Sequence, residues 1–187
     1  FDGTSQKSQR PSWNYKKSGG GGLLFDMYPH WRYVIEGLLG PIKRLVSANW
    51  TAQPNRIDEE DNSFGVDVED SSATILELTS GAFGTIQSSW ATRVRVEDLF
   101  TLQIDGTDGS GFSTLRNCWT QSDSSTPKIT GFNLGGDKKT LESRANYLQD
   151  WEEVPEIGPY KNPYRFGWEG FLEHVLSDTP FVSNFSA

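Results

Sequence analysis

Hydrophobic side chains recur at helical spacing directly after the glycine run at 19–22. The apolar positions of this stretch share one side of a helix and are Leu24, Met27, Tyr28, Trp31, Val34, Ile35 and Leu38. Gly40-Pro41 is a typical end of such a helix. Pro29 interrupts the pattern because proline lacks the N–H of a helix interior. The sequence leaves two alternatives: the regular helix begins near Pro29, or it kinks there.

Alternation of apolar and polar positions predicts strands in the following chain. The predicted strands are 42–52, 73–78, 82–90, 99–105, 112–119, 129–134 and 147–154. Ser80-Gly81 and the glycine-rich stretch 106–111 read as hairpin connections, residues 53–69 as a solvated acidic loop, and 121–127 as a mobile loop. A second helix is predicted from about Asn162 to Leu176. A helix, a run of mainly antiparallel strands and a final helix predict an α+β fold in one domain, 1–187.

Asp26 and His30 carry the main candidate chemistry. They lie four residues apart, so a helix places both side chains on one face, one turn apart. A carboxylate beside an imidazole can orient the ring and stabilise its charge once the ring has taken a proton. The alternative is a flexible loop followed by a helix whose Asp and His are merely solvated.

Two neighbouring features favour a binding site near this pair. Gly20, Gly21 and Gly22 let another molecule approach backbone N–H groups at a helix N-terminus. The segment 10–15 combines a cation, aromatic rings and an amide, a mixture that suits sugar-like surfaces. Its candidate residues are Arg10, Trp13 and Tyr15; the alternative is a surface loop whose aromatic side chain packs back on the domain.

Composition narrows the function classes. The 187 residues carry a net charge of -8, which argues against nucleic acid as a partner because that binding needs a basic surface. We see no apolar run long enough to span a membrane. The single cysteine, Cys118, forbids an internal disulfide and is typical of a reducing compartment. The many carboxylates at 53–69 match no metal-binding loop, so no metal site is predicted.

Several motifs occur in one order along the chain. Gly-Gly-Gly, Asp26-x-x-x-His30 and a Leu-Leu-Gly helix end come first, then Glu69-Asp70-x-x-Ala, Ile104-Asp-Gly-Thr-Asp-Gly, and Trp168-Glu-x-Phe-Leu-Glu-His. This ordered set resembles the second domain of the glucose–fructose oxidoreductase / inositol dehydrogenase / rhizopine-catabolism family (Gfo/Idh/MocA). The resemblance implies an α+β domain with a mainly antiparallel open sheet and helices packed on one face.

The resemblance also implies that this domain is one part of a two-domain oxidoreductase. Family members bind NAD or NADP in an N-terminal Rossmann domain, and their second domain carries substrate and subunit contacts. The chain holds neither a Gly-x-Gly-x-x-Gly motif nor the Glu-Lys-Pro segment that supplies the family's catalytic lysine. We therefore expect a fragment of a longer protein, inactive by itself, that forms homo-oligomers through the open sheet face.

The resulting hypothesis is hydride transfer between a sugar or polyol and NAD or NADP. His30 takes or gives the hydroxyl proton, Asp26 supports it, and the glycines lie near the cofactor. By the same resemblance, Trp13 and a strand end carrying Trp90 and Arg93 contact the substrate. Arg10 and Tyr15 join them from the residue mixture of segment 10–15, and the alternative for Arg93 is a cation at a strand edge. Two other classes stay open: an NAD-dependent glycoside hydrolase of the same architecture, and a non-catalytic ligand-binding or dimerisation domain. The expected location is the cytoplasm.

Overall fold

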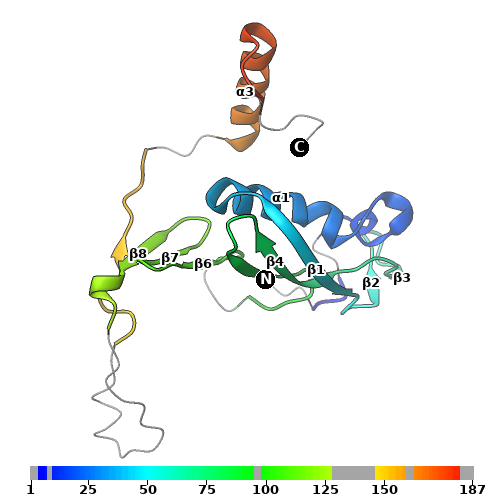
Figure 1. Cartoon of the computed structure of the whole chain (residues 1–187). Coiled ribbons are helices and arrows are strands. Elements are labelled where there is room, and N and C mark those ends of the chain that lie inside the picture. Colours follow the sequence, from blue (N-terminus) through cyan, green and yellow to red (C-terminus); the bar gives the residue numbers. More distant parts are fainter. Residues whose placement is uncertain (1–3, 8–9, 95–97, 128–145, 159–161, 182–187) are drawn as a thin grey trace, which may run out of the picture. The chain divides into compact units, whose positions relative to one another are not determined.

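The chain folds into two compact units, residues 1–99 and 100–187 (Figure 1). The structure, a computed structural model, describes residues 4–7, 10–94, 98–127, 146–158 and 162–181. All residues singled out as a candidate site lie in the first unit. The two units are described separately below.

Helix α1 runs from Leu23 to Leu39 and contains Pro29 in its interior. It therefore begins upstream of Pro29, which excludes a start at that residue. Gly22 at the N-cap has φ 125° and Gly40 at the C-cap has φ 90°, so both ends need backbone angles that glycine adopts most easily. The hydrophobic period predicts this helix correctly to within one residue at its C-terminal end.

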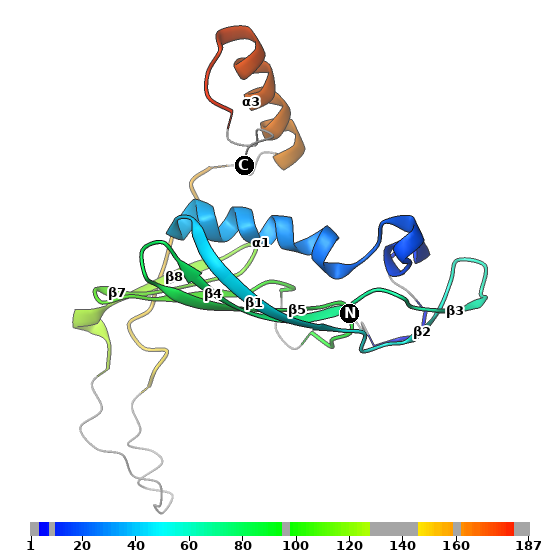
Figure 2. The ribbon, with the colours of Figure 1, turned by 45° about the vertical axis from the view of Figure 1, so that its right-hand side comes forward.

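A three-stranded antiparallel sheet lies under α1, in the order β1-β4-β5. Its strands are β1 (Ile42–Trp50), β4 (Ser71–Leu78) and β5 (Phe83–Ser89), so the predicted hairpin around Ser80-Gly81 is confirmed. Figure 2 shows α1 lying along one face of this sheet. The Tyr28 hydroxyl shares hydrogen bonds with the hydroxyls of Ser72 (2.5 Å) and Thr74 (2.6 Å), which fixes the helix on the sheet.

The core of the first unit sits where the N-terminal end of α1 meets the end of β5. Tyr15, Leu23 and Trp90 are buried together there, with Met27, Tyr28, Phe64 and Val66 packed around them. Leu76 and Leu78 of β4 are also buried. The two aromatic residues of this core, Tyr15 and Trp90, are candidate site residues, so core and candidate site share side chains.

The sheet face turned away from α1 is open. Strand alternation sends Ser72, Thr74 and Leu76 toward α1 and Ile75 to the other side. Val46, paired with Ile75, and Phe83, at the start of β5, are 66% and 71% exposed, and Ile75 is 56% exposed. An apolar face is thus uncovered in the described part of this unit.

Residues 53–69, predicted as a solvated acidic loop, contain a short hairpin of β2 (Asn55–Ile57) and β3 (Ser63–Gly65). That prediction is wrong because strands of three residues are too short to show alternation. Two 3-10 turns, Ser12–Tyr15 and Lys17–Gly19, precede α1. The hairpin and the segment that follows it hold these turns. Glu59 accepts the N–H of Ser12 (2.7 Å), and Asp67, two residues after β3, accepts that of Lys17 (2.6 Å).

The second unit contains a four-stranded sheet in the order β6-β7-β8-β9. Its strands are β6 (Leu102–Asp105), β7 (Gly109–Ser113), β8 (Cys118–Ser122) and β9 (Glu152–Glu153). The single strand predicted at 112–119 is wrong, because Thr114 accepts the N–H groups of Arg116 and Asn117 and so makes a turn between β7 and β8. The loop predicted at 121–127 instead holds the end of β8 and a 3-10 turn, Asp123–Ser125.

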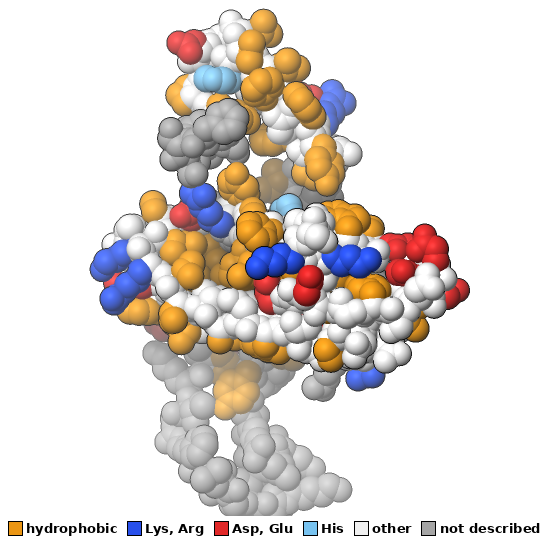
Figure 3. Space-filling model, turned by 90° about the vertical axis from the view of Figure 1, so that its right-hand side faces the viewer, with side chains coloured by type: hydrophobic (Ala, Val, Ile, Leu, Met, Phe, Trp, Pro, Cys, Tyr) orange, Lys and Arg blue, Asp and Glu red, His pale blue; other side chains and the backbone are white. Residues whose placement is uncertain are grey.

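Helix α3 (Pro163–Ser177) confirms the second predicted helix. Asn162 caps it by accepting the N–H of Tyr164 (3.0 Å), with proline in the first turn. Figure 3 shows hydrophobic side chains spread over this helix. The strand predicted at 129–134 lies outside the described residues.

The α+β class is confirmed, with antiparallel strands between two helices in the described ranges. Within those ranges, no helix has both the length and the apolar character needed to cross a membrane. The expectation of one domain across 1–187 stays a prediction.

Candidate active site

The N-terminal end of α1 is capped by Glu69, the residue that precedes the buried Asp70. The Leu23 N–H donates to the Glu69 backbone carbonyl (3.1 Å) and the Leu24 N–H to Glu69 Oε1 (3.0 Å). A carboxylate at this position also complements the positive end of the helix dipole. The anion-binding end of the helix is thus occupied by the chain's own side chain.

The glycine run packs closely on the first 3-10 turn. A Cβ on Gly21 would come within 2.3 Å of the Asn14 carbonyl oxygen, and one on Gly22 within 2.7 Å of Glu69 Oε1. Gly21 and Gly22 are buried, whereas Gly20 is exposed and has open space around it. Of the three glycines predicted to lie near a cofactor, Gly20 is the one whose surface is accessible.

Gly21→Ala should therefore destabilise the first unit by about 1–3 kcal/mol, the usual cost of overpacking against atoms that cannot move away. The neighbours here are backbone atoms of Trp13 and Asn14. Thermal unfolding checks this, with Gly37→Ala as the control. Gly37 lies in α1 with nothing near its Cβ, so that change should be neutral or stabilising. Equal melting temperatures for wild type and Gly21→Ala would contradict the packing described here.

Asp26 lies in the first turn of α1 and forms an ion pair with Arg10, whose Nη1 donates to Asp26 Oδ2. The same guanidinium donates from Nη2 to the Met27 sulfur (3.4 Å) and lies 4.7 Å from the centre of the Trp90 ring. Both charged side chains are about two-thirds buried. The sequence-predicted residues Arg10, Asp26 and Trp90 are thus brought into direct contact.

The stack continues from Trp90 into the core. Trp90 meets the Tyr15 ring edge to face at 5.4 Å, and Arg56 lies over Tyr15 at 4.4 Å. Arg56 is buried with Asp70, their nearest charged atoms 3.6 Å apart. Two stacked guanidinium groups, with two aromatic rings in contact between them, therefore connect Asp26 to Asp70. Each contact of this kind contributes about 0.5–2 kcal/mol.

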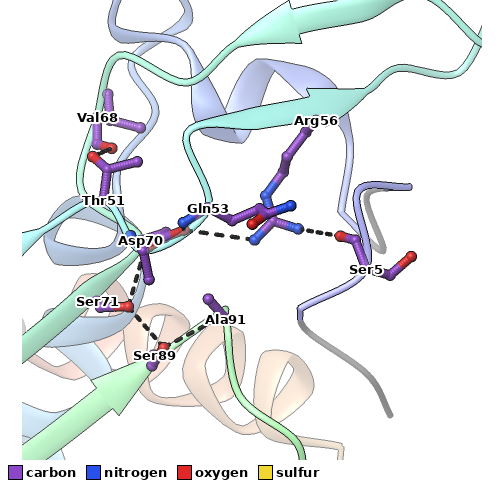
Figure 4. A network of polar contacts seen from close by, with 10 residues as sticks. Ser5, Thr51, Gln53, Arg56, Val68, Asp70, Ser71, Ser89 and Ala91 are labelled. Carbon is purple, nitrogen blue, oxygen red and sulfur yellow. Dashed lines mark hydrogen bonds and ion pairs between the residues drawn. The ribbon is translucent and has the colours of Figure 1, made fainter.

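Asp70 is the centre of a buried polar network (Figure 4). Its carboxylate accepts the N–H groups of Ala52 (2.7 Å) and Gln53 (3.0 Å) and the hydroxyl of Ser71 (2.9 Å). Its own backbone N–H and carbonyl bond to Trp50 and Trp90. Asp70 therefore joins the end of β1, the start of β4 and the residue that follows β5.

His30 lies one turn after Asp26 on α1, as the spacing predicts, and its side chain is exposed. Its imidazole has no hydrogen-bond or ion-pair partner among the residues that the structure describes. Asp26 Oδ2 is held by Arg10, and within the same residues Oδ1 accepts no hydrogen bond. The role of this pair in proton transfer stays a prediction.

Two other candidate residues lie outside the stack. Trp13 is 53% exposed on the first 3-10 turn, next to the buried Asn14 and Tyr15. Arg93 is exposed, three residues beyond Trp90. Their predicted contact with substrate stays a prediction.

Glu59, in the turn between β2 and β3, is held by a hydrogen bond to the segment before α1. The backbone N–H of Ser12 holds the pKa of the Glu59 carboxyl below its usual range. This hydrogen bond anchors the segment that carries Arg10 and Tyr15, and the lowered pKa lets it persist to a lower pH than a free carboxyl would allow. In the described part of the chain, no group of three or more His, Cys, Asp or Glu side chains is arranged to hold a metal.

Sequence reasoning missed Met27, Arg56, Glu69 and Asp70 as parts of this site. The signal for two of them is the adjacent pair Glu69-Asp70, because two acidic residues directly before a predicted strand can indicate a helix cap and a buried anchor. A groove of about 550 Å³ in the second unit involves none of the candidate residues; it is lined by Gln103, Phe112, Trp119, Tyr147, Leu148 and Trp151.

Fold and site together define a class: an α+β domain in which a sheet supports a helix carrying a carboxylate and an exposed imidazole. The chain belongs to the GFO/IDH/MocA family, since the GFO/IDH/MocA C-terminal domain matches residues 1–111, more than half of it. The motif resemblance is thereby confirmed.

Individual relatives agree with this assignment. A D-xylose dehydrogenase of Paenarthrobacter nicotinovorans is 39% identical over 181 residues, which are 95% of this chain and 45% of that protein. The chain thus spans less than half the length of this relative. Levoglucosan dehydrogenase in complex with NADH and L-sorbose superposes with a TM-score of 0.67 at 20% identity, covering 95% of this chain and 48% of that one.

A third similarity is to an NAD binding oxidoreductase from Klebsiella pneumoniae, with a TM-score of 0.54 and 23% identity over 62% of this chain and 31% of that one. At this level of identity, the two structural likenesses establish a shared fold.

Proposed function

We propose that this domain provides the substrate side of an NAD- or NADP-dependent oxidoreductase acting on a sugar, a polyol or a related secondary alcohol. The observation that carries the proposal is on α1: an exposed imidazole, His30, one turn from a carboxylate, Asp26, that Arg10 fixes in place. The similarity to a D-xylose dehydrogenase supports a sugar as the substrate.

The proposed chemistry removes a hydride and a proton from one alcohol group. A bound oxidised nicotinamide supplies the hydride acceptor. His30 takes the hydroxyl proton as the carbonyl forms, and Asp26 stabilises the resulting imidazolium. Because His30 is exposed, it can then return the proton to water. In the reverse direction His30 donates the proton to the carbonyl oxygen.

The cofactor is proposed to bind mainly in a nucleotide-binding domain of the longer protein. On this chain, Gly20 is the glycine with open space at the entrance to α1, so a dinucleotide could approach the backbone there. Trp13 and Arg93, both exposed, are the proposed outer substrate contacts. Trp90 and Tyr15 support the site from within the core.

The experiment that tests the proposal uses the complete protein with NAD⁺ or NADP⁺ and a panel of aldoses, anhydrosugars and polyols. Formation of free reduced cofactor together with an oxidised sugar supports the dehydrogenase. Hydrolysis of a glycoside with no net formation of reduced cofactor would contradict it and favour the hydrolase that shares this architecture. A domain that only binds ligands would give neither product.

The open sheet face is proposed as a contact between copies of this protein, in a cytoplasmic homo-oligomer. Val46 and Ile75, which are paired across β1 and β4, and Phe83 of β5 are exposed apolar side chains on the face opposite α1, and exposed apolar residues of this kind mark protein contacts. Ile75→Asp should reduce the mass measured by sedimentation, whereas Leu38→Asp, at an exposed apolar site on α1, should not. A monomeric wild type at high concentration would contradict this contact.

A further inference from the structure

The Arg10 guanidinium has a defined plane because it contacts Asp26, Met27 and Trp90. It donates to Asp26 Oδ2, donates to the Met27 sulfur at 3.4 Å, and stacks over the Trp90 ring with its central carbon 4.7 Å from the ring centre. A guanidinium is a rigid, planar fork, so a ring beneath it sets the direction in which its N–H groups point. Two of those groups point at consecutive residues in the first turns of α1.

The ring under Arg10 is itself held in place. Trp90 is 6% exposed, its backbone N–H donates to the Asp70 carbonyl at 2.8 Å, and its ring meets Tyr15 at an interplanar angle of 75°. Tyr15 is 2% exposed and carries the Arg56 guanidinium. Arg10 therefore rests on a surface that belongs to the core and is fixed by the Asp70 network.

The ion pair is also partly shielded from water. The side chains of Arg10 and Asp26 are 35% and 33% exposed. Attraction between opposite charges strengthens as water is excluded. Because the Arg10 guanidinium is already ordered by stacking on Trp90, forming the ion pair costs it little further conformational entropy. The pair therefore holds the Asp26 carboxylate more firmly than a fully exposed pair on a helix would.

We propose that Arg10 is a positioning residue: it holds the Asp26 carboxylate in the orientation needed to support His30, and it does not contact the substrate. This inference rests on the proposed function and differs from the sequence-based hypothesis that Arg10 lines the substrate site. The sequence pattern shows a cation near aromatics, but only the fold reveals that this cation is directed at α1.

A double-mutant cycle in the complete protein tests the inference. Arg10→Ala should lower kcat about 10- to 100-fold, the range found when a supporting partner of a functional group is removed, with KM for the sugar within about twofold of wild type. In an Asp26→Asn background, the same Arg10→Ala change should cost less than about twofold, because the group it positions has already been altered. Arg10→Lys should keep more of kcat than Arg10→Ala, since the charge remains but the fork is lost.

Two results would overturn the inference. One is an Arg10→Ala or Arg10→Lys enzyme with wild-type kcat and a strongly raised KM, which would assign Arg10 to the substrate. The other is a double variant whose loss in kcat equals the product of the losses in Arg10→Ala and Asp26→Asn, which would mean that the two residues act independently. Arg10→Lys supplies the comparison of kcat with KM if Arg10→Ala fails to fold. Wild-type kcat in Asp26→Asn itself would instead overturn the proposed function, so the two failures are distinguishable.

Discussion

His30→Ala should lower kcat by about 10²- to 10⁴-fold in the complete protein, which is the usual contribution of a positioned general acid or base. The side chain is exposed and has no polar partner among the described residues, so its removal should leave the melting temperature unchanged. Steady-state kinetics with a sugar that the wild type oxidises, together with a melting curve, measures both effects.

The chain offers a matched control in its other histidine, His174. His174 lies on α3, where its Nδ1 is 2.6 Å from the Thr179 carbonyl oxygen and its ring stacks on Phe181. His174→Ala should change kcat by no more than a few fold, although it can lower the stability of the helix end. If His30→Ala kept more than a tenth of the wild-type kcat, the proton chemistry would have to lie elsewhere.

Asp70→Ala should lower the free energy of unfolding by about 3–5 kcal/mol, the cost of breaking a buried ion pair and leaving its partner charged. Asp70 is 0% exposed and Arg56 is 1% exposed. The change would also leave the N–H groups of Ala52 and Gln53 without their carboxylate acceptor. Chemical denaturation measures the loss, and activity should fall with it because Trp90 rests on the same network.

Arg32→Ala is the control that removes an exposed ion pair instead of a buried one. Arg32 pairs with Glu36 at 2.8 Å on the surface of α1. An exposed pair of this spacing contributes at most about 1 kcal/mol. Similar losses in the free energy of unfolding for Asp70→Ala and Arg32→Ala would contradict the claim that burial makes the Asp70 network strongly stabilising.

The sequence predicts the long elements of this fold well and the short ones poorly. The apolar period of α1 spans several turns and therefore identifies the helix and its end, although Pro29 leaves its start open in the sequence and the structure places that start at Leu23. The hairpin of β4 and β5 shows clear alternation and a glycine turn. By contrast, the turn between β7 and β8 depends on one threonine hydroxyl, Thr114, and such a local hydrogen bond has no periodic signature.

The candidate site was predictable only in part. The spacing of Asp26 and His30 is a local property of one helix, so the sequence predicts their shared face if the helix begins before Pro29, and the structure places both residues on α1. The contact of Arg10 with Asp26 is different, because it depends on how the 3-10 turns fold back and on a ring, Trp90, that arrives from the end of β5. Long-range packing of this kind leaves only a composition signal: a cation and aromatic residues near a glycine run.

The central claim is that hydride passes from a sugar carbon to a nicotinamide while α1 of this domain handles the proton. The most direct measurement incubates the complete protein with oxidised cofactor and an aldose that carries deuterium at every carbon-bound hydrogen position. The nicotinamide is then examined by mass spectrometry. The account predicts one deuterium on the reduced ring and an oxidised sugar as the product. Reduced cofactor without deuterium, or no reduced cofactor with any sugar or polyol, would contradict it.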